Sequence, residues 1–390
     1  ATTSRVHTAV KIERNYSNNQ TVHVNDASRS VTVVERLLSK EKDSFIGAIR
    51  KEYEKIRLNH EGKKSKKEFL TISDVRNNAL ELNWSEYQPI VPNFLGVKIF
   101  EEYSLREIAR YIDWTPFFQT WDLHGRFPRI LDDEIVGKEA SRVYADASEM
   151  LKEIITNKWL QPRAVIGIWE ANRSAPDTVD VYENGVPIHQ FEFTRQQVKK
   201  AKGQPNLSLV DFIAPKSSGQ KDYIGGFAVT TGVGIEKHLK RFEEDKDDYN
   251  SIMLKALADR LAEAFAELMH EKVRKDFWGY AADESLKNED LIKEKYQGIR
   301  PASGYPACPD HTEKPGLFEL MNVSEHTGII LSENNAMIPA SSVSGLYFAH
   351  PESKYFGVGK IEKDQIQDLA ARKGLATEEM ERWLGANLNY

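Results

Sequence analysis

The sequence predicts an α+β fold, with a mixed or antiparallel central sheet flanked by helices and a short α/β segment ahead of it. Segments rich in β-branched and aromatic residues come in runs, and helical segments come in runs of their own instead of alternating with strands. The 390 residues are 40% hydrophobic, which is enough to build a sizeable core. Only residues 1–40 read as strand, turn and helix in succession.

The bulk composition excludes several classes of protein. At ~100–200 residues per domain, the length predicts two or three domains, or one large domain with an appendage. The net charge of −6 argues against a dedicated nucleic-acid-binding protein. No apolar run reaches the ~18–20 residues of a transmembrane helix, so we expect no membrane span. The one cysteine, Cys308, excludes an internal disulfide framework and is typical of the reducing cytoplasm.

The first forty residues are predicted to be the end of an α/β unit. Two short β-branched runs, at 7–12 and 21–24, are typical of strands. A helix cap and an apolar stripe of helical spacing follow, formed by Asn25, Asp26 and Ser28 and by Val31, Val34, Leu37 and Leu38. So few residues cannot enclose a core. Residues 1–17 also lack Met and a signal peptide. We therefore expect the sequence to begin within a longer chain.

A second helix and a basic linker are predicted over residues 41–67. An amphipathic face consists of Phe45, Ile49, Tyr53 and Ile56, and we expect the helix to end at Gly62. The lysine-rich run KKSKKEF that follows predicts a solvated hinge. No further break is evident, so residues 68–390 are predicted to form one domain.

Within that domain the elements are predicted in chain order. Residues 105–121 predict an aromatic-rich helix start and turn, and 137–160 a helix. Strands are expected at 164–171, 178–185, 188–197 and 222–234. The longest helix begins at Asp247, Asp248 or Asn250 and is filled with strong helix formers. Strands are then expected within 327–333 and 344–361, and two helices, 363–374 and 376–385, each end in a glycine cap.

The common nucleotide and metal motifs are incomplete. TGVGIE at 231–236 lacks the third glycine of a dinucleotide loop, and no Walker lysine pattern occurs. His270 has no second histidine at the spacing of a zinc protease, and Cys308 with His311 gives too few ligands for structural zinc. Asp122-Leu-His124 matches only the start of a corrinoid motif, which has glycine where Phe127 stands in this chain. We therefore predict no metal site and no catalytic residue.

One loop has an unusual composition. Residues 298–314, GIRPASGYPACPDHTEK, hold two glycines and three prolines, which rule out a regular helix or a central strand. Shaped loops often carry binding groups, although a plain connection is the alternative. Arg300 is suited to a bidentate carboxylate contact, and Tyr305 can stack on a flat ring. Aromatic residues recur at Tyr355 and Phe356, and Asp113 lies among aromatics. These features indicate a small polar ligand.

The longest helix carries ionisable residues near i, i+4 spacing, so that they share one face. They are Lys255, Asp259, Glu263, Glu267 and His270. A solvated stripe of ion pairs is one interpretation. The other is that the carboxylates hold a cation or an imidazole across an interface, and periodicity leaves both open.

Four segments together resemble the C-terminal activation domain of cobalamin-dependent methionine synthase. They are RPASGYPACPDHTEK, DDYNSIMLKALADRLAEAFAELMHEKVR, YIDWTPFF and ASSVSGLYFAHPESKYF. The R-P-A-x-G-Y-P element corresponds to that family's S-adenosylmethionine motif. The resemblance covers nearly all of residues 68–390, and residues 1–40 resemble the last strand and helix of the preceding cobalamin-binding domain.

The resemblance implies an S-adenosylmethionine site. By this likeness Asp113 binds the amino group or an adjacent polar atom, and Arg300 pairs with the carboxylate. The backbone of Ala302 and Tyr305 holds the adenine, and Gly304 permits the close approach. The pocket is completed by Tyr355 and Phe356. Ser303 replaces a residue that is often proline in the family, which changes loop stiffness more than chemistry.

The resemblance also implies contacts to the cobalamin module. Asp259 and Glu263 match carboxylates that face this module and can contact the histidine displaced from cobalt. Ala27 matches a cobalamin contact in the preceding domain. The histidine itself is expected upstream of Ala1.

The implied function is reactivation of a cytoplasmic methyltransferase of methionine biosynthesis, 5-methyltetrahydrofolate–homocysteine methyltransferase. In that family inactive cob(II)alamin is reductively methylated, with the methyl group from S-adenosylmethionine and an electron from flavodoxin or a flavoprotein reductase. Cobalamin is held mainly by the upstream module, and zinc only by a module further upstream. No nucleic-acid or membrane partner is implied. The present chain is expected to bind S-adenosylmethionine but to transfer no methyl group by itself.

Two other interpretations stay open from the residues. The domain could be a docking module for flavodoxin or a reductase, in which the nucleotide ligand is only structural. It could instead be a self-contained methyltransferase for another acceptor. That reaction needs a general base beside the sulfonium, and the loop offers no obvious one.

Overall fold

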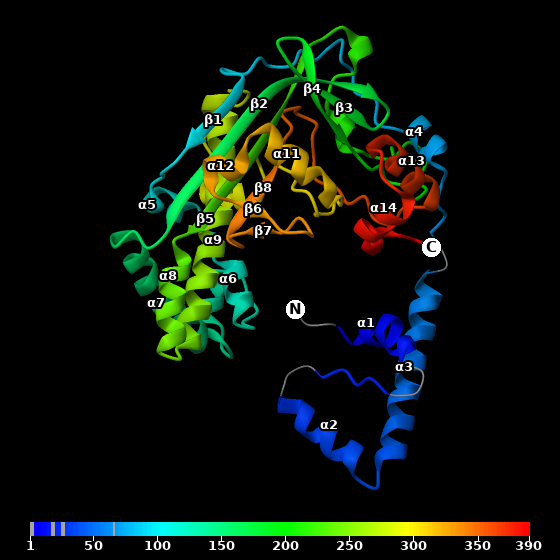
Figure 1. Cartoon of the computed structure of the whole chain (residues 1–390), viewed down its shortest axis with the longest axis vertical. Coiled ribbons are helices and arrows are strands. Elements are labelled where there is room, and N and C mark those ends of the chain that lie inside the picture. The colour runs from blue at the N-terminus through cyan, green and yellow to red at the C-terminus, as the bar shows by residue number, and fades with distance from the viewer. Residues whose placement is uncertain (1–3, 17–19, 25–27, 65–66) are drawn as a thin grey trace. The chain divides into compact units, whose positions relative to one another are not determined.

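The computed structural model divides the chain into two units, Ala1–Glu68 and Phe69–Tyr390 (Figure 1). It describes residues 4–16, 20–24, 28–64 and 67–390. Ala27, for which we predicted a cobalamin contact, lies outside the described residues, as do Asn25 and Asp26 of the predicted helix cap.

The first unit is mostly helical in its described parts, and residues 20–24 have no regular structure. Its elements are α1 (Arg5–His7), the π-helical turn η1 (Thr8–Ile12), the 3₁₀ turn η2 (Glu13–Asn15), α2 (Ser28–Leu38) and α3 (Lys42–Lys64). The predicted apolar face of α3 is confirmed, because Phe45, Ile49 and Tyr53 are buried together with Ala9, and Ile56 packs against them. This small cluster holds η1 against α3.

The two strands predicted in this unit are wrong. Residues 7–12 are helical, and residues 21–24 form no strand. A strand needs a partner for its backbone groups, whereas here the chain finds partners locally and on α3. Arg57 Nη1 donates to Ala9 O at 3.1 Å, and His23 N donates to the Tyr53 hydroxyl at 2.8 Å. Contacts with α3 therefore override the β propensity of these segments.

Two further expectations for this unit need correction. Of the predicted apolar stripe on α2 only Leu37 packs against the core, where Val33 joins it. The other three members, Val31, Val34 and Leu38, are exposed. Helix α3 does not end at Gly62 but continues to Lys64, because one glycine inside a helix costs only ~1 kcal/mol and does not break it.

The second unit is built on a six-stranded antiparallel sheet in the order β4-β3-β2-β5-β8. Its strands are β1 (Gly96–Phe100), β2 (Gln161–Ala175), β3 (Thr178–Glu183), β4 (Val186–Glu192), β5 (Asp222–Val233) and β8 (Ser342–Tyr347). Strand β5 follows one edge of β2, and β1 and β3 share its other edge. A separate short ladder pairs β6 (Ile330–Leu331) with β7 (Met337–Ile338). The predicted α+β class is confirmed.

Helices cover both faces of this sheet (Figure 1). The helices of this unit are α4 (Ile72–Asn77), α5 (Leu105–Ile108), α6 (Thr115–Thr120), α7 (Gly137–Thr156), α8 (Ile235–Glu244), α9 (Asp248–Lys272), α10 (Asn288–Ile292), α11 (Lys314–Leu320), α12 (Val323–Thr327), α13 (Lys363–Lys373) and α14 (Thr377–Trp383). Of these, α13 and α14 form a small core of their own. Alternate residues of β2 enter different cores, as the strand period requires. Ala164 and Ile166 pack on the α9 side, and Val165 packs on the side of α11.

Most element predictions for this unit are confirmed, with four corrections. The strand expected over 188–197 ends at Glu192, the one in 327–333 is only Ile330–Leu331, and the one in 344–361 ends at Tyr347. The last of these segments contains Pro351, which has no N–H for a ladder. Gly374 caps α13 with φ +66°, as predicted, but α14 is capped by Leu384 and not by Gly385. In the part of the chain that the structure describes, we find no helix both long and apolar enough to span a bilayer.

Candidate functional site

The Gly/Pro-rich loop is tied to the end of the sheet. Ile299 and Phe348 exchange two backbone hydrogen bonds of 3.0 Å, and Leu346 N donates to Pro301 O at 3.0 Å. The start of the loop therefore runs alongside β8 and its continuation. The tip is closed by hydrogen bonds from Gly304 N to Cys308 O (2.7 Å) and from Tyr305 N to Ala302 O (3.2 Å). We call residues 300–308 the cradle loop.

Gly304 is required by the shape of the cradle loop. Its φ of +93° lies in the region that residues with a side chain rarely adopt. A Cβ atom at this position would lie 2.0 Å from Cε1 of His311. The ring of His311 thus lies directly against the loop at Gly304, and the side chain of Ser303 in the loop is buried. The backbone at Gly304 therefore lies close to another part of the protein, and its predicted close approach to the ligand stays a prediction.

Arg300 is the most extensively bonded residue of the cradle loop. Its Nη2 donates to Glu267 Oε2 at 2.7 Å. Its Nη1 contacts the Tyr296 hydroxyl at 2.9 Å and His270 Nδ1 at 3.1 Å. Its backbone N–H donates to the Tyr355 hydroxyl at 3.0 Å. The side chain retains 19% of its exposure, so the guanidinium is held firmly but is not sealed off.

Two exposed tyrosines, both later in the sequence, lie near this arginine. Tyr305 is 60% exposed at the tip of the cradle loop, and Tyr355, whose hydroxyl contacts Arg300, is 37% exposed. The segment of Tyr355 is joined to the loop, because Val358 N donates to Pro306 O at 2.8 Å. Phe356 instead turns inward and packs against the two neighbouring cores. The structure thus brings the two predicted aromatic groups together.

The acidic residues of α9 face the cradle loop. Burial raises the pKa of Glu263, and the charges of Arg260 and Arg300 partly offset this effect. Burial also raises the pKa of Tyr305, and the negative charges of Glu263 and Asp259 add to the increase. Asp259 is more exposed and forms an ion pair with Arg260. Carboxylates and an exposed phenol ring therefore share one surface.

The stripe on α9 is not solvated along its whole length. Lys255 and Asp259 are exposed, but Glu267 and His270 are buried. A uniformly solvated ion-pair stripe is therefore excluded, because its second half forms part of the wall behind Arg300. The partner of that half is an arginine of the same chain.

Asp113 is held close to the same helix. It precedes α6, and its Oδ1 accepts a hydrogen bond from Thr115 N at 2.9 Å. The preceding 3₁₀ turn η3 (Ala109–Tyr111) packs on α9, where the Tyr111 hydroxyl donates to Glu271 Oε2 at 2.7 Å. Glu271 lies one turn beyond Glu267, the partner of Arg300. No hydrogen bond joins Asp113 to Arg300 within the described residues.

Sequence reasoning gave no role to several residues that contact Arg300. Glu267 and His270 were noted only as members of the stripe, and Tyr296 was not singled out. Glu294 was also missed; burial raises its pKa and the charge of Arg300 opposes the shift, so it too lies within reach of that charge. The i, i+3 spacing of Glu267 and His270 was the available signal, but spacing does not reveal burial.

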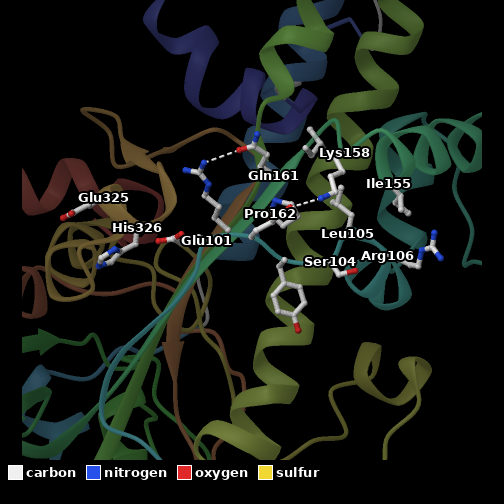
Figure 2. Close-up of a pocket in the computed structure, with 14 residues that line it drawn as sticks. Glu101, Ser104, Leu105, Arg106, Ile155, Lys158, Gln161, Pro162, Glu325 and His326 are labelled. Atoms are coloured by element: carbon white, nitrogen blue, oxygen red, sulfur yellow. Dashed lines mark hydrogen bonds and ion pairs between the residues drawn. The ribbon is translucent and has the colours of Figure 1, made fainter.

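A hollow of about 1020 Å³ lies elsewhere, at the start of β2 (Figure 2). Charged side chains of both signs line it. Lys158 Nζ contacts Glu102 Oε1 at 3.1 Å, and Arg163 Nη2 donates to Gln161 Oε1 at 3.2 Å. None of the predicted site residues lines this hollow. We therefore do not assign the candidate site to this hollow.

The cradle loop and its neighbours can hold a small ligand that carries an anionic group and a flat ring. Arg300 offers a cation, and Tyr305 and Tyr355 offer exposed aromatic surface. Ala302 N–H has no hydrogen-bond partner among the described residues. Within the same residues no group of three or more His, Cys, Asp and Glu side chains is placed to hold a metal ion.

Comparisons with known proteins show which family the chain resembles. A profile of the family described as "Vitamin B12 dependent methionine synthase, activation domain" matches residues 104–374. A solved structure described as "Crystal Structure of the MetH Reactivation Domain bound to AdoHcy" is 51% identical in sequence. The similarity covers 83% of this chain and 99% of that one, with a TM-score of 0.80.

Proposed function

This chain belongs to the family of vitamin B12-dependent methionine synthase activation domains, and from that premise we propose that its cradle loop binds S-adenosylmethionine and S-adenosylhomocysteine. The proposal rests on the contacts and the partial exposure of Arg300. Its guanidinium is fixed by Glu267 and Tyr296, yet the side chain remains 19% exposed beside the two exposed tyrosines. The similar solved structure contains AdoHcy, which supports the same ligand here.

The ligand's three parts match three features of the site. Arg300 pairs with the α-carboxylate, since a planar guanidinium suits a bidentate carboxylate contact. The free N–H of Ala302 donates to the adenine, and the ring of Tyr305 covers it. Tyr355 closes the pocket beside Arg300, and Asp113 binds the ligand's ammonium group or an atom next to it. Phe356 supports the pocket from the core side.

The site serves to present the methyl group of the bound sulfonium to its acceptor. The protein contributes position, because a methyl group held at attack distance from its acceptor avoids much of the entropic cost of the reaction. A loop that is fixed at both ends and has glycine at its tip can lie close to a flat acceptor. No side chain of the cradle loop acts on the methyl group, so the chain's own role is to bind and orient.

We place this step in the reactivation of methionine synthase, a cytoplasmic methyltransferase of methionine biosynthesis. Cobalamin, held mainly by a neighbouring module and in part by Ala27, is the methyl acceptor, and flavodoxin or a flavoprotein reductase supplies one electron. Asp259 and Glu263 face that module, where they accept a hydrogen bond from its displaced histidine. The exposure of Asp259 supports this assignment.

Isothermal titration calorimetry of the chain with S-adenosylmethionine and with S-adenosylhomocysteine tests the proposal. We expect one saturable site per chain. Arg300→Ala is expected to weaken binding by about 1.5–3 kcal/mol, the range for a hydrogen bond to a charged group. Arg142→Ala, in an exposed pair on α7, is the matched control and should leave affinity unchanged. Equal affinity of Arg300→Ala and wild type would exclude the cradle loop as the carboxylate site.

The reactivation step needs a second assay. The chain is mixed with a cobalamin-loaded neighbouring module, reduced flavodoxin and S-adenosylmethionine, and methylcobalamin is followed by its absorption spectrum. Methylation that requires all three additions supports the proposal. Methyl transfer by the chain without the cobalamin module would favour a self-contained methyltransferase instead.

A further inference from the structure

A cluster of buried polar side chains lies behind Arg300 and has no assigned role. Helix α9 supplies Glu267 and His270, and its continuation supplies Arg274. All three are buried, which is costly for charged groups unless they are paired. Tyr280 and Tyr296 lie on the same cluster, with hydrogen bonds to His270 and Arg300 respectively.

The hydrogen bonds of Arg300 are distributed unevenly over its guanidinium. Nη1 has two hydrogens, and both are used by the Tyr296 hydroxyl and His270 Nδ1. Nη2 donates to Glu267 Oε2. Nε–H has no partner within the described part of the chain, although the side chain is partly exposed. The Nε–Nη2 edge, which forms one of the two forks of a guanidinium, is therefore the edge left open to a ligand.

His270 must be neutral to make this arrangement. A guanidinium only donates hydrogen bonds, so Nδ1 of His270 accepts from Arg300 and the ring proton lies on Nε2. Burial lowers the pKa of His270 well below its usual value, and the charges of Arg274 and Arg300 lower it further. Nε2 faces the Tyr280 hydroxyl at 3.4 Å.

Aromatic contacts fix the plane of the His270 ring. The ring stacks on Tyr347 with centroids 5.2 Å apart and an interplanar angle of 17°. Tyr296 meets it edge-on, with centroids 4.9 Å apart and an angle of 81°. Because the ring cannot easily rotate, the direction of its Nδ1 acceptor is fixed, and so is the position of Arg300 Nη1.

Glu267 supplies the charge that holds the other end of the guanidinium. Its Oε2 accepts from Arg300, and its Oε1 lies 3.8 Å from Arg274 Nη1. The carboxylate thus lies between two cations, and Arg274 is itself paired with Glu284 at 2.7 Å. A second carboxylate can then approach Arg300 with less repulsion, because part of the charge of Glu267 is already neutralised by Arg274.

We infer that His270 and Glu267 are positioning residues that turn the Nε–Nη2 edge of Arg300 toward the α-carboxylate of the ligand. The inference rests on the proposed function and deepens it. According to this inference, the buried imidazole of His270 makes the site selective for ligands with an amino-acid carboxylate, although it does not touch the ligand. Removing the acceptor at His270 frees Nη1, so the guanidinium loses its fixed orientation.

Two ligands separate positioning from a general structural role. S-Adenosylhomocysteine carries the α-carboxylate, whereas 5′-methylthioadenosine has the same nucleoside without it. Affinities of both are measured by calorimetry for wild type, His270→Phe and His270→Asn. We expect His270→Phe to weaken S-adenosylhomocysteine binding at least tenfold and to leave 5′-methylthioadenosine binding within twofold. His270→Asn should recover most of the loss, because Asn Oδ1 can occupy the place of His Nδ1 as an acceptor.

A second variant keeps the inference testable if His270→Phe does not fold. Tyr296→Phe removes the other Nη1 acceptor and keeps the ring, so it should cause a smaller loss that is again confined to S-adenosylhomocysteine. His189→Asn is the control, since His189 packs on Phe191 of β4 and has no contact with Arg300. Equal weakening of both ligands by these variants would reduce His270 to a structural residue, and unchanged S-adenosylhomocysteine affinity would overturn the inference.

The same experiment distinguishes a failure of this inference from a failure of the proposed function. If wild type binds neither ligand, or if Arg300→Ala binds S-adenosylhomocysteine as wild type does, the proposed site itself is wrong. If Arg300→Ala loses selectivity for S-adenosylhomocysteine while His270→Phe keeps it, the site stands and only the positioning role is refuted.

Discussion

Replacement of Gly304 by alanine tests the shape of the cradle loop directly. The residue has φ +93°, and a Cβ atom would lie 2.0 Å from His311 Cε1. Moving the His311 ring has a cost, because its Nδ1 lies 3.2 Å from Lys314 Nζ. The backbone of His311 is also held, since its carbonyl oxygen accepts a hydrogen bond from the Asn335 side chain. Either the loop tip or the His311 ring must therefore shift.

The expected cost follows from two separate effects. A left-handed conformation costs a residue with a side chain about 1–2 kcal/mol, and forcing an extra methyl into a packed site costs about 1–3 kcal/mol. Together they predict a loss of about 2–5 kcal/mol in the free energy of unfolding. We also expect weaker S-adenosylhomocysteine binding, because Tyr305 and Ala302 adjoin the displaced residue.

Gly185→Ala is the matched control. Gly185 lies in the turn between β3 and β4 with φ +78°, and a Cβ atom there meets nothing within 4 Å. It should therefore show the conformational cost alone, about 1–2 kcal/mol, with ligand affinity unchanged. Urea unfolding and calorimetry are measured for both variants. If Gly304→Ala were no less stable than Gly185→Ala and bound the ligand equally well, the close packing against His311 would be refuted as a determinant of the site.

Two further predictions concern charges buried away from the cradle loop. Arg195→Met removes the fully buried partner of Asp177 and Asp211, which lies 2.8 and 2.7 Å from them, and leaves each with one arginine that is less buried, Arg76 and Arg173 respectively. It is expected to lower the free energy of unfolding by about 3–5 kcal/mol in urea titrations; a loss as small as that of the exposed Arg142→Ala would contradict it. Burial raises the pKa of Asp222 from 3.8 to about 7, so the folded state binds more protons than the unfolded state between these values and stability should fall as pH rises from about 4 to 7. Comparing wild type with Asp222→Asn across this range isolates the slope, and parallel pH profiles would disprove the assignment.

Much of the second unit was predictable because the information is local. The three possible caps, Asp247, Asp248 and Asn250, and the helix formers that follow place α9 within two residues of its observed start at Asp248. The glycines and prolines of residues 298–314 exclude regular structure whatever surrounds them, and the observed loop agrees. The strands β2 and β5 were found because each is rich in residues that fit a pleated, buried surface.

The failures occurred where partners lie far away in the sequence. Residues 7–12 have β-branched side chains, but η1 packs on α3 and forms hydrogen bonds there instead of in a sheet. On α2 the apolar spacing was correct for a helix, yet Val31 and Val34 are exposed. Periodicity identifies the type of element, but it does not say which neighbour covers its apolar face.

The sequence by itself determined the α+β class, the long helix and the presence of a shaped loop with an arginine near its start. Each of these depends on residues within a few positions of one another. Only the tertiary structure decided what Arg300 contacts, since Glu267 lies 33 positions before it and Tyr355 lies 55 positions after it. These groups meet because α9 covers the sheet while the loop runs along β8. Because part of the charged stripe on α9 is buried, His270 is neutral and Glu267 is paired, and both lie behind the guanidinium of Arg300.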